Sequence, residues 1–249
     1  MKTRPVLAGH DTLKTATPDP PTLCRAALFA AGVAVWLFQA CVTGPPKLAP
    51  VPDRVESLDG FGSISVRGGE IAVKGRFAFV FQRPDFGRIE ALDPFGRTIS
   101  ILLFGGGTAY MILPSKGVYW SGPEENLMDK FLGFGLRASE VSTLIGGRWE
   151  DRPPGDTVQG PAWSIEKDGQ GRALKGSRDG FLFETAEFFQ GTSVPRAIVF
   201  SGPKGSGRLR VLKIHFNTPR RGDPFGLAVL KALREKTWPE IEAYLRDED

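Results

Sequence analysis

Cysteine and histidine are scarce in this chain of 249 residues. The two cysteines are Cys24 and Cys41, and the two histidines are His10 and His215. Beyond residue 40 only Cys41 and His215 remain, so that part of the chain can form no internal disulfide and no thiolate metal site. A catalytic centre built on several histidines is excluded for the same reason, and we expect neither a metal nor a bound cofactor.

The chain also lacks a strong excess of charge of one sign. It carries 32 Lys and Arg against 28 Asp and Glu, which gives a net charge of +4, and the two signs are interspersed. Nucleic-acid binding requires a concentrated basic surface, so we expect no nucleic-acid partner. A hydrophobic content of 41% with 24% charged residues is typical of an ordinary globular domain.

Motifs of catalysis are missing as well. The chain has no G-x-S-x-G sequence, and GPKGSG at residues 202–207 lacks the phosphate-loop pattern and lies between two expected strands. Glu184 and Glu187 are three residues apart in an expected strand, which places them on opposite faces. Residues Lys204, Arg208, Arg210, Arg220 and Arg221 are interpreted as a solvated edge, with contact to anionic lipid headgroups as the alternative. The sequence therefore predicts a protein that is not an enzyme.

An apolar run near the start of the chain, AALFAAGVAVWLFQAC at residues 26–41, predicts a secretory signal. Its uncharged part, residues 26–38, falls in the ~7–15 residue range of a signal and below the ~20 needed to cross a bilayer. Arg25 supplies the positive flank. We expect a signal peptide over residues 1–40, followed by Cys41. A cleaved signal without lipid and an uncleaved anchor are the alternatives, whereas flanking prolines disfavour a buried helix.

After the signal, a proline-rich stretch at residues 41–58 is interpreted as an extended tether. Alternation of apolar and polar residues follows, for example Phe77, Phe79 and Phe81 on one face of an expected strand. Glycine-rich turns separate such segments, which indicates a meander of antiparallel strands. The expected strands are 59–66, 71–81, 87–92, 98–104, 108–113, 118–120, 162–167, 171–178, 181–188, 195–201 and 208–217.

Two short helices interrupt the strands. Ser121 and Glu124 have the spacing of a capping box, so a helix is expected to begin there. Apolar residues at helical spacing form one stripe in the first helix and another in the second. These residues are Leu127, Met128, Phe131 and Leu132, then Val141, Leu144 and Ile145. Residues 218–249 form a tail with helices expected at 227–236 and 239–246.

The order of a signal ending in cysteine, a strand meander, two short helices and a second meander resembles the LolA/LolB lipoprotein-localisation family. The resemblance is carried by GRFAFVFQRPDFGRIEALDPFGRTISILL at residues 75–103 and DKFLGFGLRASEVSTLIGG at residues 129–147. It covers residues 59–217 and is closest to LolB. It implies an α+β fold, mostly β, in which an antiparallel half-open β-barrel carries short lid helices over an apolar cavity. The helical tail, residues 218–249, is additional to that pattern.

The resemblance also implies a function. The cavity would hold acyl chains of lipoproteins, each buried CH₂ contributing about 0.8 kcal/mol. The cavity and lid residues would be Phe77, Phe79, Phe81, Leu127, Met128, Phe131, Leu132, Val141, Leu144 and Ile145. The alternative is the same fold with a filled core and a structural or partner-docking role, since an ordinary core also uses many of the 18 phenylalanines.

The turn Pro94-Phe95-Gly96 looks like the loop of LolB whose exposed apolar residue inserts lipoproteins into the membrane. The resemblance therefore implies a membrane-insertion role for Phe95. A phenylalanine left in water forgoes about 1.5–3 kcal/mol of burial, so exposure would require a reason such as membrane contact. The alternative is that Phe95 folds back onto the sheet.

Cys41 resembles the lipidated cysteine of bacterial lipoproteins, although Phe38 and Gln39 depart from the usual lipobox. The resemblance implies a covalent lipid on Cys41 as the only non-protein group. With Val42 rather than aspartate after it, sorting to the outer membrane with the domain facing the periplasm is implied. The expected partners are acylated lipoprotein cargo, a LolA-like carrier and outer-membrane lipid, and we expect a monomer.

Overall fold

The computed structural model describes residues 48–68, 73–149 and 162–246, without the side chains of Val73 and Leu132. The chain divides into two units, Met1–Gly44 and Pro45–Asp249, and the described residues all belong to the second. The expected signal peptide over residues 1–40 and the lipidated Cys41 therefore lie outside the described residues.

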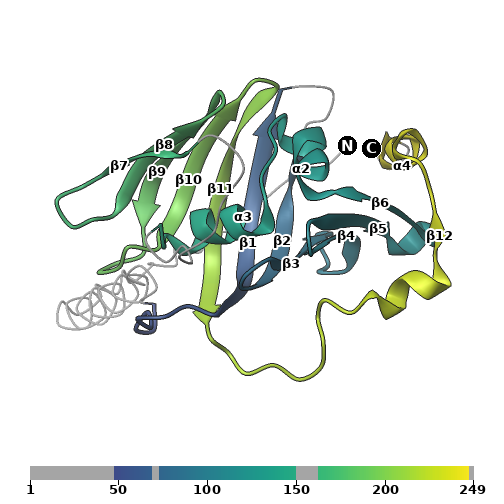
Figure 1. Cartoon of the computed structure of the whole chain (residues 1–249), viewed down its shortest axis with the longest axis horizontal. Coiled ribbons are helices and arrows are strands. Elements are labelled where there is room, and N and C mark those ends of the chain that lie inside the picture. The colour runs from purple at the N-terminus through teal and green to yellow at the C-terminus, as the bar shows by residue number, and fades with distance from the viewer. Residues whose placement is uncertain (1–47, 69–72, 150–161, 247–249) are drawn as a thin grey trace, which may run out of the picture. The chain divides into compact units, whose positions relative to one another are not determined.

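A 12-stranded sheet forms the body of this second unit, in the order β12-β6-β5-β4-β3-β2-β1-β11-β10-β9-β8-β7 (Figure 1). Its strands are β1 Ser57–Arg67, β2 Val73–Gln82, β3 Phe86–Leu92, β4 Thr98–Gly105, β5 Thr108–Leu113, β6 Val118–Pro123, β7 Ser164–Lys167, β8 Ala173–Arg178, β9 Phe181–Phe188, β10 Pro195–Gly202, β11 Gly205–Phe216 and β12 Arg234–Glu235. The helices are α2 Glu124–Leu132, α3 Ala138–Gly146 and α4 Trp238–Arg246, with 3₁₀ turns η1 Pro114–Lys116 and η2 Leu227–Ala232. Neighbouring strands are antiparallel except β12 and β6, which are parallel.

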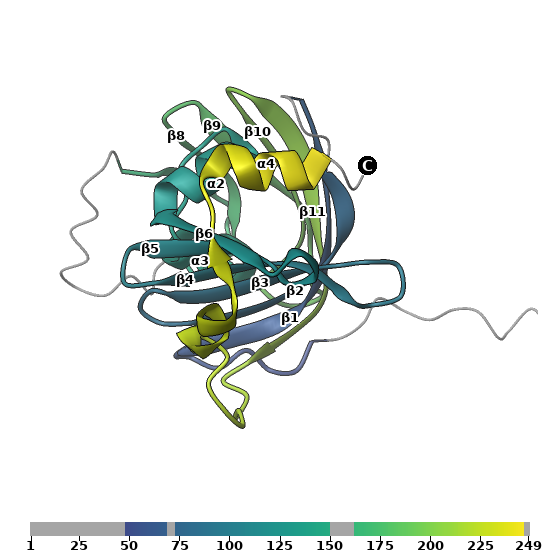
Figure 2. The ribbon, with the colours of Figure 1, turned by 90° about the vertical axis from the view of Figure 1, so that its right-hand side faces the viewer.

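The sheet is curled but not closed. Figure 2 views it end-on, with the strands arranged around a centre and the tail passing in front of β6. Strand β1 joins the two halves because it pairs with β2 on one side and β11 on the other. Helices α2 and α3 pack against the inner face. The expected fold, mostly β with a half-open antiparallel barrel and few helices, is confirmed.

Alternation along β2 decides which side chains form the core. Phe77, Phe79 and Phe81 are 6%, 1% and 2% exposed, whereas Arg76 is exposed. Two of these rings lie over glycines of the neighbouring strand: a Cβ at Gly62 would be 2.5 Å from the ring of Phe77. Glycine in a strand interior here permits the close approach of an aromatic ring.

The capping box expected at Ser121 and Glu124 is wrong. Ser121 lies in β6, whose pairing with β5 extends to Pro123, and its hydroxyl donates to Glu235. Helix α2 begins at Glu124, and the carboxylate of Glu124 accepts the Ala138 N–H at the start of α3 instead. Pairing between β5 and β6 therefore includes Ser121, which the local sequence pattern assigned to a helix cap.

The tail is helical only in part. The helix expected at residues 227–236 is instead the turn η2 followed by β12, while α4 confirms the helix expected at residues 239–246. The N–H groups of Arg234 and Lys236 donate to carbonyls of Gly117 and Tyr119 at 3.0 and 2.8 Å. The free edge of β6 thus offers backbone hydrogen bonds that override the local helix preference.

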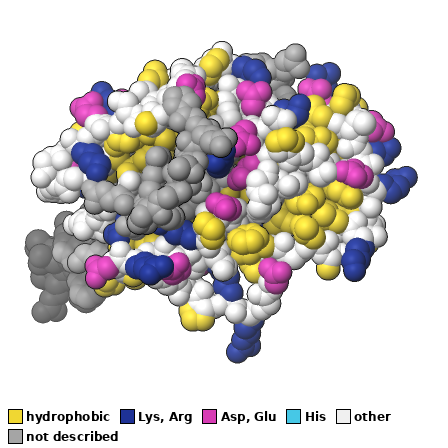
Figure 3. Space-filling view, viewed as in Figure 1, with side chains coloured by type: hydrophobic (Ala, Val, Ile, Leu, Met, Phe, Trp, Pro, Cys, Tyr) yellow, Lys and Arg dark blue, Asp and Glu magenta, His cyan; other side chains and the backbone are white. Residues whose placement is uncertain are grey.

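The described end of the expected tether contacts the domain. Val55 is 3% exposed, and Leu48 and Val51 pack against the core. On the face seen in Figure 3, apolar side chains gather over β4, β5 and β6, and charged side chains of both signs are interspersed around them. No helix in the described ranges is long and apolar enough to cross a membrane.

Candidate functional site: an apolar cavity beneath two helices

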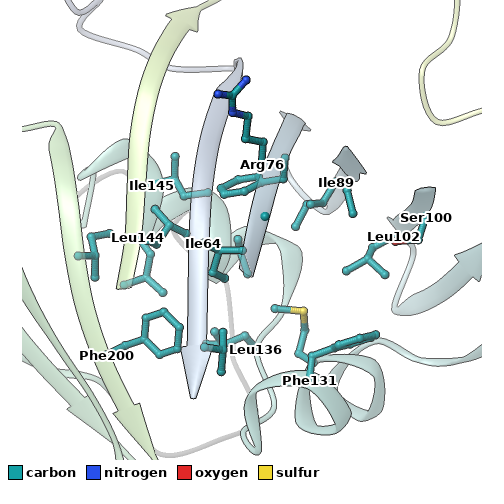
Figure 4. Close-up of a pocket in the computed structure, with 18 of the residues that line it drawn as sticks. Ile64, Arg76, Ile89, Ser100, Leu102, Phe131, Leu136, Leu144, Ile145 and Phe200 are labelled. Atoms are coloured by element: carbon teal, nitrogen blue, oxygen red, sulfur yellow. The ribbon is translucent and has the colours of Figure 1, made fainter. Parts of the chain in front are cut away.

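A cavity of about 220 Å³ lies between the inner face of the sheet and helices α2 and α3 (Figure 4). Its lining is apolar except for Arg76 and Ser100, and Figure 4 shows the guanidinium of Arg76 directed away from the apolar side chains. The lining residues are Ile64, Val66, Gly75, Arg76, Phe77, Ile89, Ala91, Ser100, Leu102, Met111, Met128, Phe131, Leu136, Val141, Leu144, Ile145, Phe181, Ile198, Phe200 and Leu209. Such a lining can bind hydrocarbon but provides no charged partner for a polar substrate.

The structure separates the residues expected to form the cavity and lid. Those that line the cavity are Phe77, Met128, Phe131, Val141, Leu144 and Ile145. Phe79, Phe81 and Leu127 do not line it and are core residues instead. The side chain of Leu132 lies outside the described residues.

Phe81 shows why part of the inner face holds no cavity. A Cβ at Gly87 would lie 2.9 Å from the ring of Phe81 and 3.1 Å from the Ala138 side chain, so the start of α3 fills this part of the barrel. The remaining lining, such as Leu136, Ile198 and Leu209, was not identified from the sequence. Alternation indicates which residues face inward, but it does not show which of them border an unfilled space.

The cavity is small for its expected occupant. Ligand pockets usually measure about 300–1,000 Å³, so about 220 Å³ accommodates only a short segment of hydrocarbon. A longer acyl chain exceeds this volume while α2 and α3 lie against the sheet. Both helices end at a glycine, Gly133 and Gly147, and each glycine has a φ of 69°. This left-handed backbone conformation is strained for other residues, so glycine is favoured at both helix ends.

Helix α3 is fixed to the far half of the sheet by a buried ion pair. The side chains of Glu140 and Arg178 are 6% and 8% exposed and in direct contact. Trp163 donates to Glu140 over 2.7 Å, and the guanidinium lies 5.0 Å from the ring of Phe134 and 4.8 Å from that of Trp163. Arg178 also donates to the Gly135 carbonyl at 2.9 Å, so the pair connects β8 with both α3 and the loop before it.

A second buried carboxylate connects the two helices. Glu124 is 3% exposed, and burial raises its pKa to about 7 although the hydrogen bond from the Ala138 N–H acts in the opposite direction. Its charged form is therefore disfavoured in the folded protein below neutral pH.

This raised pKa predicts a pH-dependent stability. Below the ordinary glutamate pKa of 4.5, Glu124 is protonated in both states and its contribution is fully present; that contribution is lost as pH rises through about 7. The full change amounts to about 3 kcal/mol. We expect Glu124→Gln to abolish this component while keeping the acceptor for Ala138, as measured by urea unfolding between pH 5 and 8. The exposed Glu166→Gln serves as the control, and an unchanged pH profile in Glu124→Gln would contradict the assignment.

The turn between β3 and β4 holds Phe95 in solvent, where it is 85% exposed. Asp93 accepts hydrogen bonds from the N–H groups of Phe95 and Arg97 at 2.8 and 2.9 Å, and from Arg97 Nε at 2.6 Å. The backbone hydrogen bond from Arg97 is the main cause that holds the pKa of Asp93 below its usual value. Gly96 adopts φ 83°, and the guanidinium of Arg97 lies 5.6 Å from the Phe95 ring. The turn is thus internally braced, and Phe95 does not fold back onto the sheet.

Other chemistry is sparse in the described ranges. No group of three His, Cys, Asp or Glu side chains there could hold a metal ion. His215 is exposed, and its Nδ1 lies 3.2 Å from Asp59 on the neighbouring strand. The arrangement provides an apolar cavity with a protruding aromatic turn.

A curled, unclosed antiparallel sheet with helices on its inner face defines the fold class, and comparison with known proteins agrees. No family model and no curated protein matches the chain. A DUF1329 family protein from Desulfovibrio piger is similar in structure, with a TM-score of 0.52 at 9% identity over 72% of this chain and 92% of that one. A domain described as an outer membrane lipoprotein-sorting protein, from Vibrio parahaemolyticus, gives 0.50 at 14% identity over 72% and 93%.

A LolA superfamily protein from Nitrosomonas europaea has a TM-score of 0.46 at 11% identity, over 66% of this chain and 88% of that one. At these identities the likeness to the first two structures is a likeness of fold.

Proposed function

We propose that this protein binds acyl chains of lipoproteins in its apolar cavity and delivers them to a membrane through the Phe95 turn. The observation that carries the proposal is the cavity of about 220 Å³, lined by hydrocarbon and covered by α2 and α3. The similar fold of a lipoprotein-sorting domain supports it. The resemblance of residues 75–103 and 129–147 to LolB makes insertion, rather than carriage alone, the proposed step.

The mechanism is partition of hydrocarbon and requires no bond to be made or broken. An acyl chain displaces the helices, and each methylene that it buries contributes about 0.8 kcal/mol. Phe131 belongs to both the helix and the cavity lining, so movement of α2 changes the cavity directly. Phe95, 85% exposed, then enters the lipid surface and shortens the path of the acyl chain through water.

The proposed location follows from the sequence. A signal ending at Cys41 would place a lipid on that residue and anchor the protein at the outer membrane, with the described domain facing the periplasm. The proposed partners are acylated lipoproteins and a LolA-like donor, and the protein is proposed to act as a monomer.

A second candidate is an envelope lipoprotein that docks a partner and transfers no cargo. The tail favours it, because Trp238 packs edge-on against Trp120 and Phe131, at 5.5 and 5.8 Å between ring centres, and so holds α2 against the sheet. In that case the cavity would remain closed, and the tail surface would be the functional part.

Transfer of an acylated peptide from the purified protein to liposomes tests the two candidates. We expect uptake of a diacylated peptide but not of the same peptide without lipid, and we expect delivery to liposomes. Phe95→Glu should keep uptake and slow delivery about ten-fold, because the burial of one phenylalanine side chain in the lipid surface is lost. Leu182→Glu is the control, since Leu182 is an apolar residue exposed by 54% on β9, which is separated from β1 by β11 and β10 and lies outside the turn.

The outcomes separate the candidates. Absence of uptake by the folded wild type would reject transfer and favour partner docking. Equal slowing by Phe95→Glu and Leu182→Glu would reject a specific role of the turn.

A further inference from the structure

A second hollow lies on the outer face of the sheet, beside the Phe95 turn. It is a groove of about 800 Å³, lined by side chains of β1, β2 and β11 and bordered by Pro94 and Ile99. We call it the basic groove. Its lining includes Lys74, Arg76, Arg208 and Arg210. Unlike the inner cavity, it combines strong positive charge with access to solvent.

Strand register arranges these cations in two rows. Ser63 of β1 lies opposite Arg76 of β2 and Arg210 of β11. Ser65 is flanked in the same way, by Lys74 and Arg208. Residues directly opposite each other project from the same face, and strands are about 4.8 Å apart, so each row spans about 10 Å with a hydroxyl at its centre.

The positive charge of the basic groove is only partly neutralised. Arg210 donates to both carboxylate oxygens of Glu187, on β9, at 3.0 Å. Arg208 donates to one of these oxygens at 3.4 Å. The acidic lining residue, Asp93, is already bound to Arg97. Among the residues that the structure describes, neither Lys74 nor Arg76 forms an ion pair. The groove therefore retains cations and a pair of hydroxyls that can bind an anion.

The neighbourhood of the groove indicates the form of that anion. Phe95 protrudes from the turn that supplies Pro94, and Ile99, which borders the groove, is 37% exposed. Cations beside exposed apolar side chains are the combination that binds a lipid surface, in which headgroup phosphates lie above hydrocarbon. A free anion in water would gain nothing from the exposed phenylalanine.

We propose that the basic groove binds phosphate headgroups of anionic phospholipids and thereby sets the orientation in which the Phe95 turn meets the membrane. Lys74 and Arg76 contact headgroups directly, while Arg208 and Arg210 are shared with Glu187. The inference names the lipid class that the protein would meet during delivery. The role of the groove in delivery rests on the proposed function, whereas its binding to lipid does not. Its test uses vesicles without acylated cargo, so that the two can fail separately.

The experiment measures binding of the full protein to vesicles of phosphatidylcholine, with and without phosphatidylglycerol. We expect tighter binding to the anionic vesicles. Each basic residue near such a surface contributes about five-fold, so Lys74→Gln combined with Arg208→Gln should weaken this binding about ten- to thirty-fold. Glu187→Gln should strengthen it about five-fold, because Arg208 and Arg210 are released. Uptake of the diacylated peptide should not change in the double variant.

Lys175→Gln combined with Lys231→Gln is the matched control, since it removes the same charge from outside the groove. An equal loss in this control would overturn the proposal, because net charge alone would then explain binding. Glu187→Gln without gain would also overturn it. Inorganic phosphate that displaces the protein fully at millimolar concentration would show a site for free phosphate rather than for headgroups, and would likewise overturn it.

Discussion

Replacing Arg178 with alanine is expected to lower the free energy of unfolding by about 3–5 kcal/mol. The side chain of Glu140 is 6% exposed, and its carboxylate would lose its charged partner while remaining buried. The guanidinium also covers Phe134 and Trp163, so the truncation removes packing as well. Chemical denaturation at neutral pH measures the effect.

Two variants test whether the loss arises from an isolated buried charge. Glu140→Leu combined with Arg178→Met removes both charges and should restore most of the stability, because well-packed apolar residues often replace a buried ion pair at little cost. Lys175→Ala breaks an ion pair with Glu184 in which the charged atoms are 4.0 Å apart and the two side chains are 56% and 63% exposed. It should change the free energy of unfolding by less than about 1 kcal/mol. A similar effect in Lys175→Ala and Arg178→Ala would contradict the role assigned to burial.

Filling the cavity should weaken acyl binding strongly without unfolding the protein. Gly75 lines the cavity, and a Cβ placed on it would meet no atom within 4 Å. Its side chain would point inward, since it alternates with Arg76 and shares the face of Phe77. Gly75→Leu introduces four side-chain carbon atoms into the cavity. They occupy the space of about four methylenes of the acyl chain, each of which contributes about 0.8 kcal/mol when it is buried. We therefore expect affinity for a fluorescent fatty acid to fall about 100-fold.

The matched control is Gly169→Leu. Gly169 lies in the turn between β7 and β8, and a Cβ there also meets nothing within 4 Å. Both variants should have the melting temperature of the wild type within a few degrees, but only Gly75→Leu should lose binding. Unchanged affinity in a folded Gly75→Leu protein would show that acyl chains bind elsewhere.

Local patterns in the sequence were sufficient for most of the strands. The alternation of Phe77, Phe79 and Phe81 gave the inner face of β2, and glycine-rich turns gave the hairpins. The failures occurred where pairing between strands overrode a local helical pattern. Ser121 pairs with Tyr110 of β5 and therefore belongs to β6 rather than to a helix cap. Residues 234–235 have a helical sequence pattern but pair with β6 at the edge of the sheet.

The candidate site was less predictable than the fold, for a physical reason. The ion pair of Glu140 joins it to a residue 38 positions away, and nothing in the local sequence marks Arg178 as that partner. The basic groove depends on the register between β2, β1 and β11, which a single sequence does not reveal. The position of Phe95 in a turn was easier to predict, because Asp93 and Gly96 define the turn within five consecutive residues, whereas its exposure was left open.

The central position of β1 has a consequence for the order of folding. Its first residue is fixed by Asn217, whose side-chain oxygen accepts the Ser57 N–H at 3.1 Å across 160 residues of sequence. Until β11 has been synthesised, one edge of β1 has no partner, and contacts this distant in sequence form slowly. The nascent chain therefore carries an open strand edge through most of its synthesis.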